Sequence, residues 1–228
     1  MNKTLIYTVI TGNYDPIKQP LVVEEGVEYV LFTNNSEIID AGVWKVVQIP
    51  SEEWPGRTAR ENNILQSRKV KMLPHEYLPE VAGWSIYIDA DMVIKRPLTE
   101  LLSKLQPETL FAACRHSYCK NVQEEIADLL AKNMVQPEQV KEQWNKYSEW
   151  GFRDDLGISE NGLLIRRHND RRVQKLMEFW WSEYQQGCLR DQVSLMPCIY
   201  KSNFMPYFQF IDINISANEY LEVLKHNY

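Results

Sequence analysis

One short segment constrains the fold more than any other part of the sequence. Residues 84–88 form an almost unbroken run of aromatic and aliphatic side chains, and Asp89-Ala90-Asp91 follows at once. Such a run, rather than an alternating one, is typical of a strand buried on both faces of an α/β sheet. Ligands of these sheets collect beyond the carboxyl ends of the strands. The two carboxylates therefore predict a site for Mg²⁺ or Mn²⁺, and a nucleoside diphosphate is the first ligand expected.

Length and composition limit the classes of protein that fit. With 228 residues, 44% of them hydrophobic, the chain predicts a single domain. A net charge of −6 argues against general nucleic-acid binding. No apolar stretch approaches the roughly 20 residues of a membrane span, and the N-terminus lacks signal-peptide features, so a cytosolic protein is expected. The four cysteines show no paired metal spacing and predict reduced thiols rather than a zinc site.

The remaining segments predict a one-domain α/β fold with a helical insertion between residues 121 and 150. Strands are expected at 4–10, 27–33, 43–49, 109–114 and 162–166, and strand-like residues at 204–215. Helices are expected at 58–73, 99–105, 121–133, 137–150, 173–184 and 190–199. The insertion is well placed to form the acceptor side of a cleft.

The helix expected at 58–73 carries a stripe of positive charge. At 100° per residue, Arg57, Arg60, Arg68 and Lys71 fall on one face together with Ile64. A solvated basic face is one interpretation of this stripe. The other is a set of cations that faces a diphosphate, which is plausible because apolar residues occupy much of the remaining circumference.

Polar side chains also follow several predicted strands and begin one helix. Asn13 and Asn34 come after the first two strands, where contacts to a base or ribose are expected, although ordinary turn chemistry explains them as well. Arg190-Asp191-Gln192 opens the helix expected at 190–199. The Asp191 carboxylate is interpreted either as a helix cap or as part of a site.

Motifs across nearly the whole chain carry a family resemblance. In order they are Tyr7–Asp15, Tyr29–Asn34, Arg68–His75, Ile86–Asp91, Arg115-His116, Glu160 with Arg166 and His168, and Trp180-Trp181 with Arg190-Asp191-Gln192. This set resembles the GT-A-fold glycosyltransferases. More specifically, it is similar to a glycosyltransferase-like family long described as a domain of unknown function, with members in plant wall-polysaccharide biology and bacterial saccharide gene clusters.

The resemblance implies a mixed, mainly parallel sheet flanked by helices. Within the single domain, residues 1–98 would form a nucleotide-sugar half and residues 99–228 an acceptor half. Asp91 and Asp89 would hold Mn²⁺ or Mg²⁺ against the donor diphosphate, with His226 as a candidate further ligand. The donor-binding residues implied are Thr11, Asn13, Tyr14, Asn34, Arg68, Lys71, Asp89, Arg190 and Gln192.

The implied activity is metal-dependent transfer of a sugar from a nucleotide-diphosphate sugar, a UDP-sugar being the first expectation. The acceptor would be a saccharide or a lipid-linked saccharide, which extends the expected location to the inner face of a membrane and the expected role to polysaccharide biosynthesis. If the reaction inverts the anomeric carbon, Asp191 or Glu160 would serve as base. If it retains the configuration, the departing phosphate can take that role and Asp191 would position the donor.

Three alternatives remain open from the sequence. The acidic pair can close a turn without binding metal. Asp89-Ala90-Asp91 also fits the nucleophile motif of haloacid-dehalogenase-like phosphatases, although that motif usually opens the domain. A sugar-binding module without catalysis would bind saccharides but not nucleotides in a metal-dependent way. Nucleotidyl transfer is less favoured, because no glycine-rich phosphate loop follows the first strand.

Overall fold

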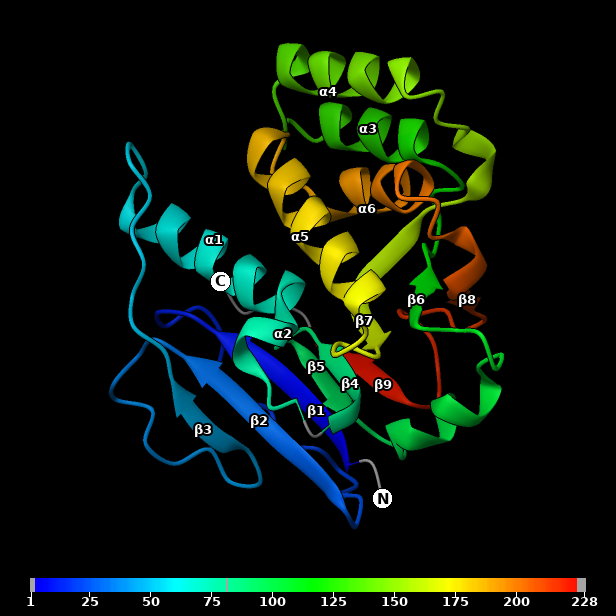
Figure 1. Ribbon diagram of the computed structural model, residues 1–228. Coiled ribbons are helices and arrows are strands. Elements are labelled where there is room, and N and C mark those ends of the chain that lie inside the picture. Colours follow the sequence, from blue (N-terminus) through cyan, green and yellow to red (C-terminus); the bar gives the residue numbers. More distant parts are fainter. Residues whose placement is uncertain (1–2, 81, 225–228) are drawn as a thin grey trace.

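A computed structural model describes residues 3–80 and 82–224 of the chain (Figure 1). A seven-stranded sheet with the order β3-β2-β1-β4-β7-β6-β8 forms its centre. Pairing is parallel from β3 to β4 and between β6 and β8, whereas β7 runs antiparallel to both of its neighbours. The expected mixed, mainly parallel α/β sheet is confirmed. The strands are β1 Lys3–Ile10, β2 Val27–Thr33, β3 Lys45–Gln48, β4 Ala82–Ile88, β6 Phe111–Arg115, β7 Ser159–Arg166 and β8 Phe208–Ile211.

Both faces of the sheet are covered, but by different elements. Tyr7 and Val9 of β1 belong to a core shared with the α-helices, and α1, α5 and α6 lie over this face in Figure 1. Ile6 and Ile10 point to a second core that includes Leu98 of a 3-10 helix. The helices are α1 Ala59–Met72, α2 Pro74–Tyr77, α3 Val122–Ala131, α4 Pro137–Glu149, α5 Arg171–Gln186, α6 Asp191–Lys201, and 3-10 helices Leu98–Lys104, Asp154–Leu156 and Met205–Tyr207.

Local sequence signals explain where α1 begins and ends. Thr58 caps the helix by accepting a hydrogen bond from the backbone N of Glu61, and the Glu61 carboxylate accepts one from the backbone N of Thr58. This reciprocal capping box satisfies two backbone donors that the helix leaves open. Pro74 was expected only to close the helix, but it also begins α2, since proline fits the first helical position.

The predicted insertion joins two neighbouring strands. α3 and α4 lie between β6 and β7, which pair antiparallel, so the insertion leaves the sheet continuous. Two short strands were not expected: β5 Met92–Ile94 and β9 Leu221–Val223 pair with each other beside the main sheet. The strand-like segment 204–215 forms only β8, after a 3-10 helix.

The strand directions gather many loops at one edge of the sheet. The carboxyl ends of β1, β2, β4 and β6 and the beginning of β7 all lie there.

Two further expectations concern the cysteines and membrane-spanning helices. The four cysteines are free and buried, as predicted. Among the described residues no helix is both long and apolar enough to cross a membrane.

Candidate active site

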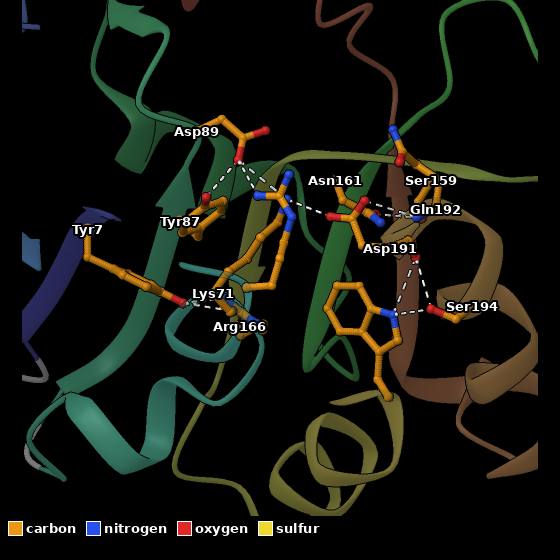
Figure 2. Close-up of polar contacts among 12 residues, drawn as sticks. Tyr7, Lys71, Tyr87, Asp89, Ser159, Asn161, Arg166, Asp191, Gln192 and Ser194 are labelled. Carbon is orange, nitrogen blue, oxygen red and sulfur yellow. Dashed lines mark hydrogen bonds and ion pairs between the residues drawn. The ribbon is translucent and has the colours of Figure 1, made fainter. Parts of the chain in front are cut away.

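Asp89 follows β4 and its carboxylate is surrounded by donors. Its Oδ1 accepts a hydrogen bond of 2.6 Å from the Tyr87 hydroxyl. The Lys71 Nζ lies 3.4 Å away and the Arg68 guanidinium 3.9 Å away from the same oxygen (Figure 2). Tyr87 comes from β4 itself, whereas both cations come from the last turns of α1. Arg68 and Lys71 of the predicted basic stripe therefore meet the strand end, whereas Arg57 and Arg60 are exposed near the other end of the helix, where Arg57 pairs with Glu61.

Lys71 also joins Asp89 to a second carboxylate from a distant part of the chain. Its Nζ lies 2.8 Å from Oδ2 of Asp191, and the two side chains are only 1% and 8% exposed. Asp191 is the first residue of α6. The Trp180 indole N donates to the Ser194 hydroxyl at 3.0 Å and to the Asp191 carbonyl at 3.3 Å, which fixes the beginning of α6. Lys71 is thus held between the two carboxylates (Figure 2).

The surrounding charges set the protonation state of Asp191. Burial alone would raise the pKa of this carboxyl, but the Lys71 ammonium and the Arg68 guanidinium lower the pKa to about 2. Its Oδ1 also accepts a hydrogen bond from the backbone N of Gln192 at 3.1 Å. The helix-cap interpretation of Asp191 is therefore incomplete, because the same carboxylate bonds the first turn of α6 and a buried lysine.

The low pKa of Asp191 predicts a loss of stability in strongly acid solution. Unfolding returns this pKa from about 2 to 3.8, so the stabilisation is fully present above about pH 4 and is lost as the pH falls through about 2. The difference corresponds to about 2 kcal/mol. Urea unfolding measures the free energy of unfolding of the wild type and of Asp191→Asn between pH 5 and pH 2. The difference between the two proteins should become smaller as the pH falls. A difference that stays constant over this range would contradict the ion pair.

The sequence comparison identifies the family of this fold and site. A sequence profile described as "TOD1/MUCI70, glycosyltransferase-like domain" matches residues 2–220. The chain belongs to the TOD1/MUCI70 glycosyltransferase-like family. The expected family resemblance and enzyme class, a glycosyltransferase, are confirmed by this match. No curated protein sequence matches the chain.

Two solved glycosyltransferase structures are similar to this TOD1/MUCI70 family member. The galactosyltransferase LgtC, in complex with donor and acceptor sugar analogs, has 13% sequence identity and a TM-score of 0.50 over 91% of this chain and 72% of LgtC. Mouse xyloside xylosyltransferase 1 in its apo form has 13% identity and a TM-score of 0.49, over 92% and 85% of the two chains. The match to LgtC confirms the GT-A fold.

The loops after β1 and β2 lie near α1, but much of their polarity is used within the fold. Thr11 donates to the carbonyl of Asn63 at 2.7 Å. The Asn34 amide accepts from the backbone N of Gly12 at 2.7 Å and donates to the side chains of Asn63 and Gln66. Thr11 and Asn34 therefore brace this edge of the TOD1/MUCI70 domain. Asn13 and Tyr14 are exposed in the loop after β1, and the Asn13 side-chain oxygen accepts a hydrogen bond from the Asn35 amide.

Three other predicted site residues lie on α6, on β7 or next to these elements. Arg190 precedes α6 without capping it, and Gln192 follows Asp191 in its first turn. Glu160 lies in β7, where its carboxylate accepts hydrogen bonds from the backbone N and the hydroxyl of Ser117. Glu160 therefore ties β7 to the loop after β6.

Asp91 lies next to the last described strand. Its carbonyl accepts a hydrogen bond of 2.9 Å from the backbone N of Leu224. Leu224 directly follows β9, the strand that pairs with β5. Asp91 itself is partly exposed. His226, the candidate further metal ligand, lies outside the described residues.

Three residues at the site were not singled out in the sequence. Tyr87 bonds Asp89, and its place two residues earlier in the same strand is the signal that could have found it. Asn161 is 1% exposed, and its amide nitrogen has no hydrogen-bond partner in the structure. The carbonyl of Gly162 accepts a hydrogen bond from the backbone N of Asp89 at 2.9 Å. Asn161 escaped notice because β7 was expected to begin only at 162, and Gly162 because it contacts Asp89 through its backbone carbonyl.

Proposed function

We propose that the protein transfers a sugar from a nucleotide-diphosphate sugar, with UDP as the first nucleotide expected, to a saccharide or lipid-linked saccharide acceptor. The observation that carries the proposal is the buried Lys71 between Asp89 and Asp191, at the edge of the sheet where strand ends gather. A carboxylate for a metal, that of Asp89, cations for a diphosphate and a carboxylate for sugar hydroxyls lie within one cluster, and Asp91 follows Asp89 by two residues. LgtC, which shares the fold, has been solved in complex with donor and acceptor sugar analogs, and this supports the general reaction.

The residues present fit a hard divalent cation such as Mn²⁺ or Mg²⁺. Asp89 and Asp91 supply carboxylate oxygens, which such ions prefer. The donors Tyr87, Lys71 and Arg68 all face Oδ1 of Asp89. None of these described contacts falls on Oδ2, which is therefore the Asp89 oxygen that we assign to the metal ion. We assign Asp89 and Asp91 as the metal ligands, with His226 as a candidate third.

Lys71 and Arg68 have a separate task in this proposal. A nucleoside diphosphate gains negative charge as the glycosidic bond breaks, and fixed cations in a site of low dielectric stabilise that charge without a proton transfer. A bound divalent cation would add the same kind of stabilisation as a Lewis acid. The two cations are held in place by carboxylates, so little reorganisation is needed when the diphosphate binds.

The low pKa of Asp191 argues against a role as the general base. A general base works best when its pKa is near the operating pH. The cations that lower the pKa of Asp191 to about 2 make it a poor proton acceptor at neutral pH. We therefore assign Asp191, with Gln192 and the buried Asn161 amide, to holding the donor sugar. Glu160 is the base if the reaction inverts the anomeric carbon, and the departing phosphate takes this role if the reaction retains it.

The remaining donor contacts follow from the strand ends. Asn13 and Tyr14 are assigned to the nucleoside, with Thr11 and Asn34 holding their loop, and Arg190 to the sugar-phosphate side. Residues 1–98 then form the donor half and residues 99–228 the acceptor half of one domain. A role in polysaccharide biosynthesis, at the cytoplasmic face of a membrane, is part of this proposal.

A panel of nucleotides with and without Mn²⁺ tests the donor. Uridine, guanosine, cytidine and thymidine diphosphates and their common sugar conjugates are compared by thermal unfolding. A ligand at a hundredfold excess over its Kd stabilises the native state by about 2.7 kcal/mol, or roughly 5–10 °C at this size. We expect a Mn²⁺-dependent shift for one nucleotide, uridine first. The absence of any metal-dependent shift would reject the donor proposal.

The same panel separates the two rival functions. A haloacid-dehalogenase-like phosphatase would use Asp89 as nucleophile and would hydrolyse a phosphate ester without transferring sugar. A sugar-binding module would respond to glycans and not to nucleotides. The match to a glycosyltransferase-like family favours neither of them.

A further inference from the structure

A hollow lies in the half of the chain assigned to the acceptor, near the cluster of Asp89, Lys71 and Asp191. It has a volume of about 300 Å³ and is lined by the loop after β6, Arg115 to Lys120, and by Ile158. This is at the lower end of the range for ligand pockets, roughly 300–1,000 Å³. Ser117 of this loop donates to Glu160 at 2.6 Å, and Glu160 stands two residues before Gly162, which bonds Asp89. Two residues of strand span about 7 Å, so the hollow borders the proposed donor site.

The lining of the hollow is held in place by buried hydrogen bonds. The backbone N of Cys119 donates to Nδ1 of His116 at 3.0 Å. The Cys119 thiol donates to the Glu125 carboxylate at 3.4 Å, and Nε2 of His116 lies 3.5 Å from the same oxygen. All three side chains are almost inaccessible to solvent. The loop therefore has a defined shape before any ligand binds.

Two cations at this hollow lack acidic partners. Neither Arg115 nor Lys120 forms an ion pair with any residue that the structure describes. Arg115 is exposed, and its guanidinium carbon lies 4.1 Å from the centroid of the Phe210 ring, which orients the group. Asp212, which follows β8 beside this end of β6, forms no ion pair with Arg115 within 4.0 Å. The carboxylates that contact this loop, those of Glu124, Glu125 and Glu160, are bonded to other groups of the loop, so among the described residues they leave the Arg115 guanidinium without an ion pair.

An aromatic ring completes the hollow. Tyr118 is 64% exposed, which is unusual for a large aromatic side chain. Its ring contacts His116 edge to face, at 4.5 Å between centroids, and the Lys132 ammonium lies 5.7 Å from its centroid. Exposed tyrosine rings offer a flat apolar face with a polar tip, which suits the C–H face and hydroxyls of a sugar.

We propose that this hollow binds the acceptor and that the acceptor is an acidic saccharide, whose carboxylate or phosphate group pairs with Arg115 while a sugar ring packs on Tyr118. The inference rests on the proposed function, because it is the donor site beside Glu160 that makes the hollow an acceptor site. A guanidinium is suited to both anions, since its fork of N–H donors matches two oxygens at once.

Direct binding measurements test this inference without relying on transfer. The probes are an oligosaccharide of uronic acids, the same oligosaccharide with its carboxyl groups reduced to alcohols, and a sugar phosphate. We expect the acidic forms to bind at least about tenfold more tightly than the reduced form, and high salt to weaken them. Whether the carboxylate or the phosphate probe binds better identifies the anion. Equal binding of the acidic and reduced oligosaccharides would overturn the proposal.

Variants locate the binding. Arg115→Gln should weaken the acidic probes about tenfold and leave the reduced probe unchanged, and Tyr118→Ala should weaken all three. Arg171→Gln is the matched control, because Arg171 is exposed at the start of α5, beyond the opposite end of β7. If Arg115→Gln has no more effect than Arg171→Gln, the hollow is not the acceptor site.

The nucleotide panel, run on Arg115→Gln, keeps this result separate from the donor proposal. Metal-dependent nucleotide binding without preference for acidic saccharides would reject only the acceptor inference. Arg115-dependent saccharide binding without nucleotide binding would reject the transferase function and, with it, the acceptor role of the hollow.

Discussion

Replacing Asp191 with leucine is expected to destabilise the protein by about 3–5 kcal/mol and to abolish transfer. Lys71 is 1% exposed and would keep its buried charge after losing the carboxylate 2.8 Å away. Removing one partner of a buried pair is much more costly than removing an exposed one, because the remaining charge stays desolvated, and only Asp89, 3.4 Å from the Lys71 Nζ, would still compensate it. Urea unfolding at neutral pH measures the change in stability, and a transfer assay with the donor found by the nucleotide panel measures activity.

A double variant separates the structural role of this pair from its chemical role. Combining Lys71→Met with Asp191→Leu replaces the pair by apolar groups, which is often neutral for stability. We therefore expect the double variant to regain most of the lost stability and none of the activity. Lys69→Met is a suitable control on the same helix, because Lys69 pairs with Glu52 in a more exposed position and should matter by less than about 1 kcal/mol. Recovered transfer in the double variant would remove Asp191 and Lys71 from the proposed mechanism.

The second large effect is expected at Asp91. Asp91→Asn removes one charged oxygen ligand, so Mn²⁺ affinity and transfer should each fall by at least about 100-fold. Stability should change little, because the side chain is partly exposed and the carbonyl bond to Leu224 remains. Calorimetric titration with Mn²⁺, in the presence of the nucleotide, measures the loss directly.

A matched substitution provides the control for Asp91→Asn. Asp212 is an exposed aspartate that follows β8 at the same edge of the sheet. Asp212→Asn makes the same chemical change and should leave Mn²⁺ affinity within about twofold of the wild type. Full metal-dependent turnover by Asp91→Asn would instead return the acidic pair to the role of a simple turn.

Much of the fold follows from local sequence signals. Nearly continuous apolar runs predict β1, β2 and β4, because strands buried on both faces have apolar side chains at most positions. The capping residues around Thr58 predict the beginning of α1 within one residue. The antiparallel direction of β7 could not be predicted, because an apolar run looks the same in parallel and antiparallel strands. The first residues of β7, Ser159 to Asn161, were not assigned to the strand because they are polar and precede the apolar run.

The candidate site was predictable in its parts and not in its assembly. The strand-end carboxylates and the basic stripe of α1 were visible in the sequence. The contact between Lys71 and Asp191 depends on how α1 and α6 pack on the sheet, and no local signal records that packing. Asn34 shows the opposite case, because its side chain was expected at a nucleotide and is used instead to join the first two strands to α1. Residue type alone does not separate these two uses.

The Lys71–Asp191 contact also bears on the order in which the protein assembles. The two residues are 120 positions apart in the sequence. Closing so long a segment costs chain entropy before any contact forms, so contacts of this kind tend to form late in folding. Both charges can stay hydrated until α1 and α6 have docked. The pair would then slow unfolding more than it speeds folding, and the active centre would be completed only when both halves of the chain are in place.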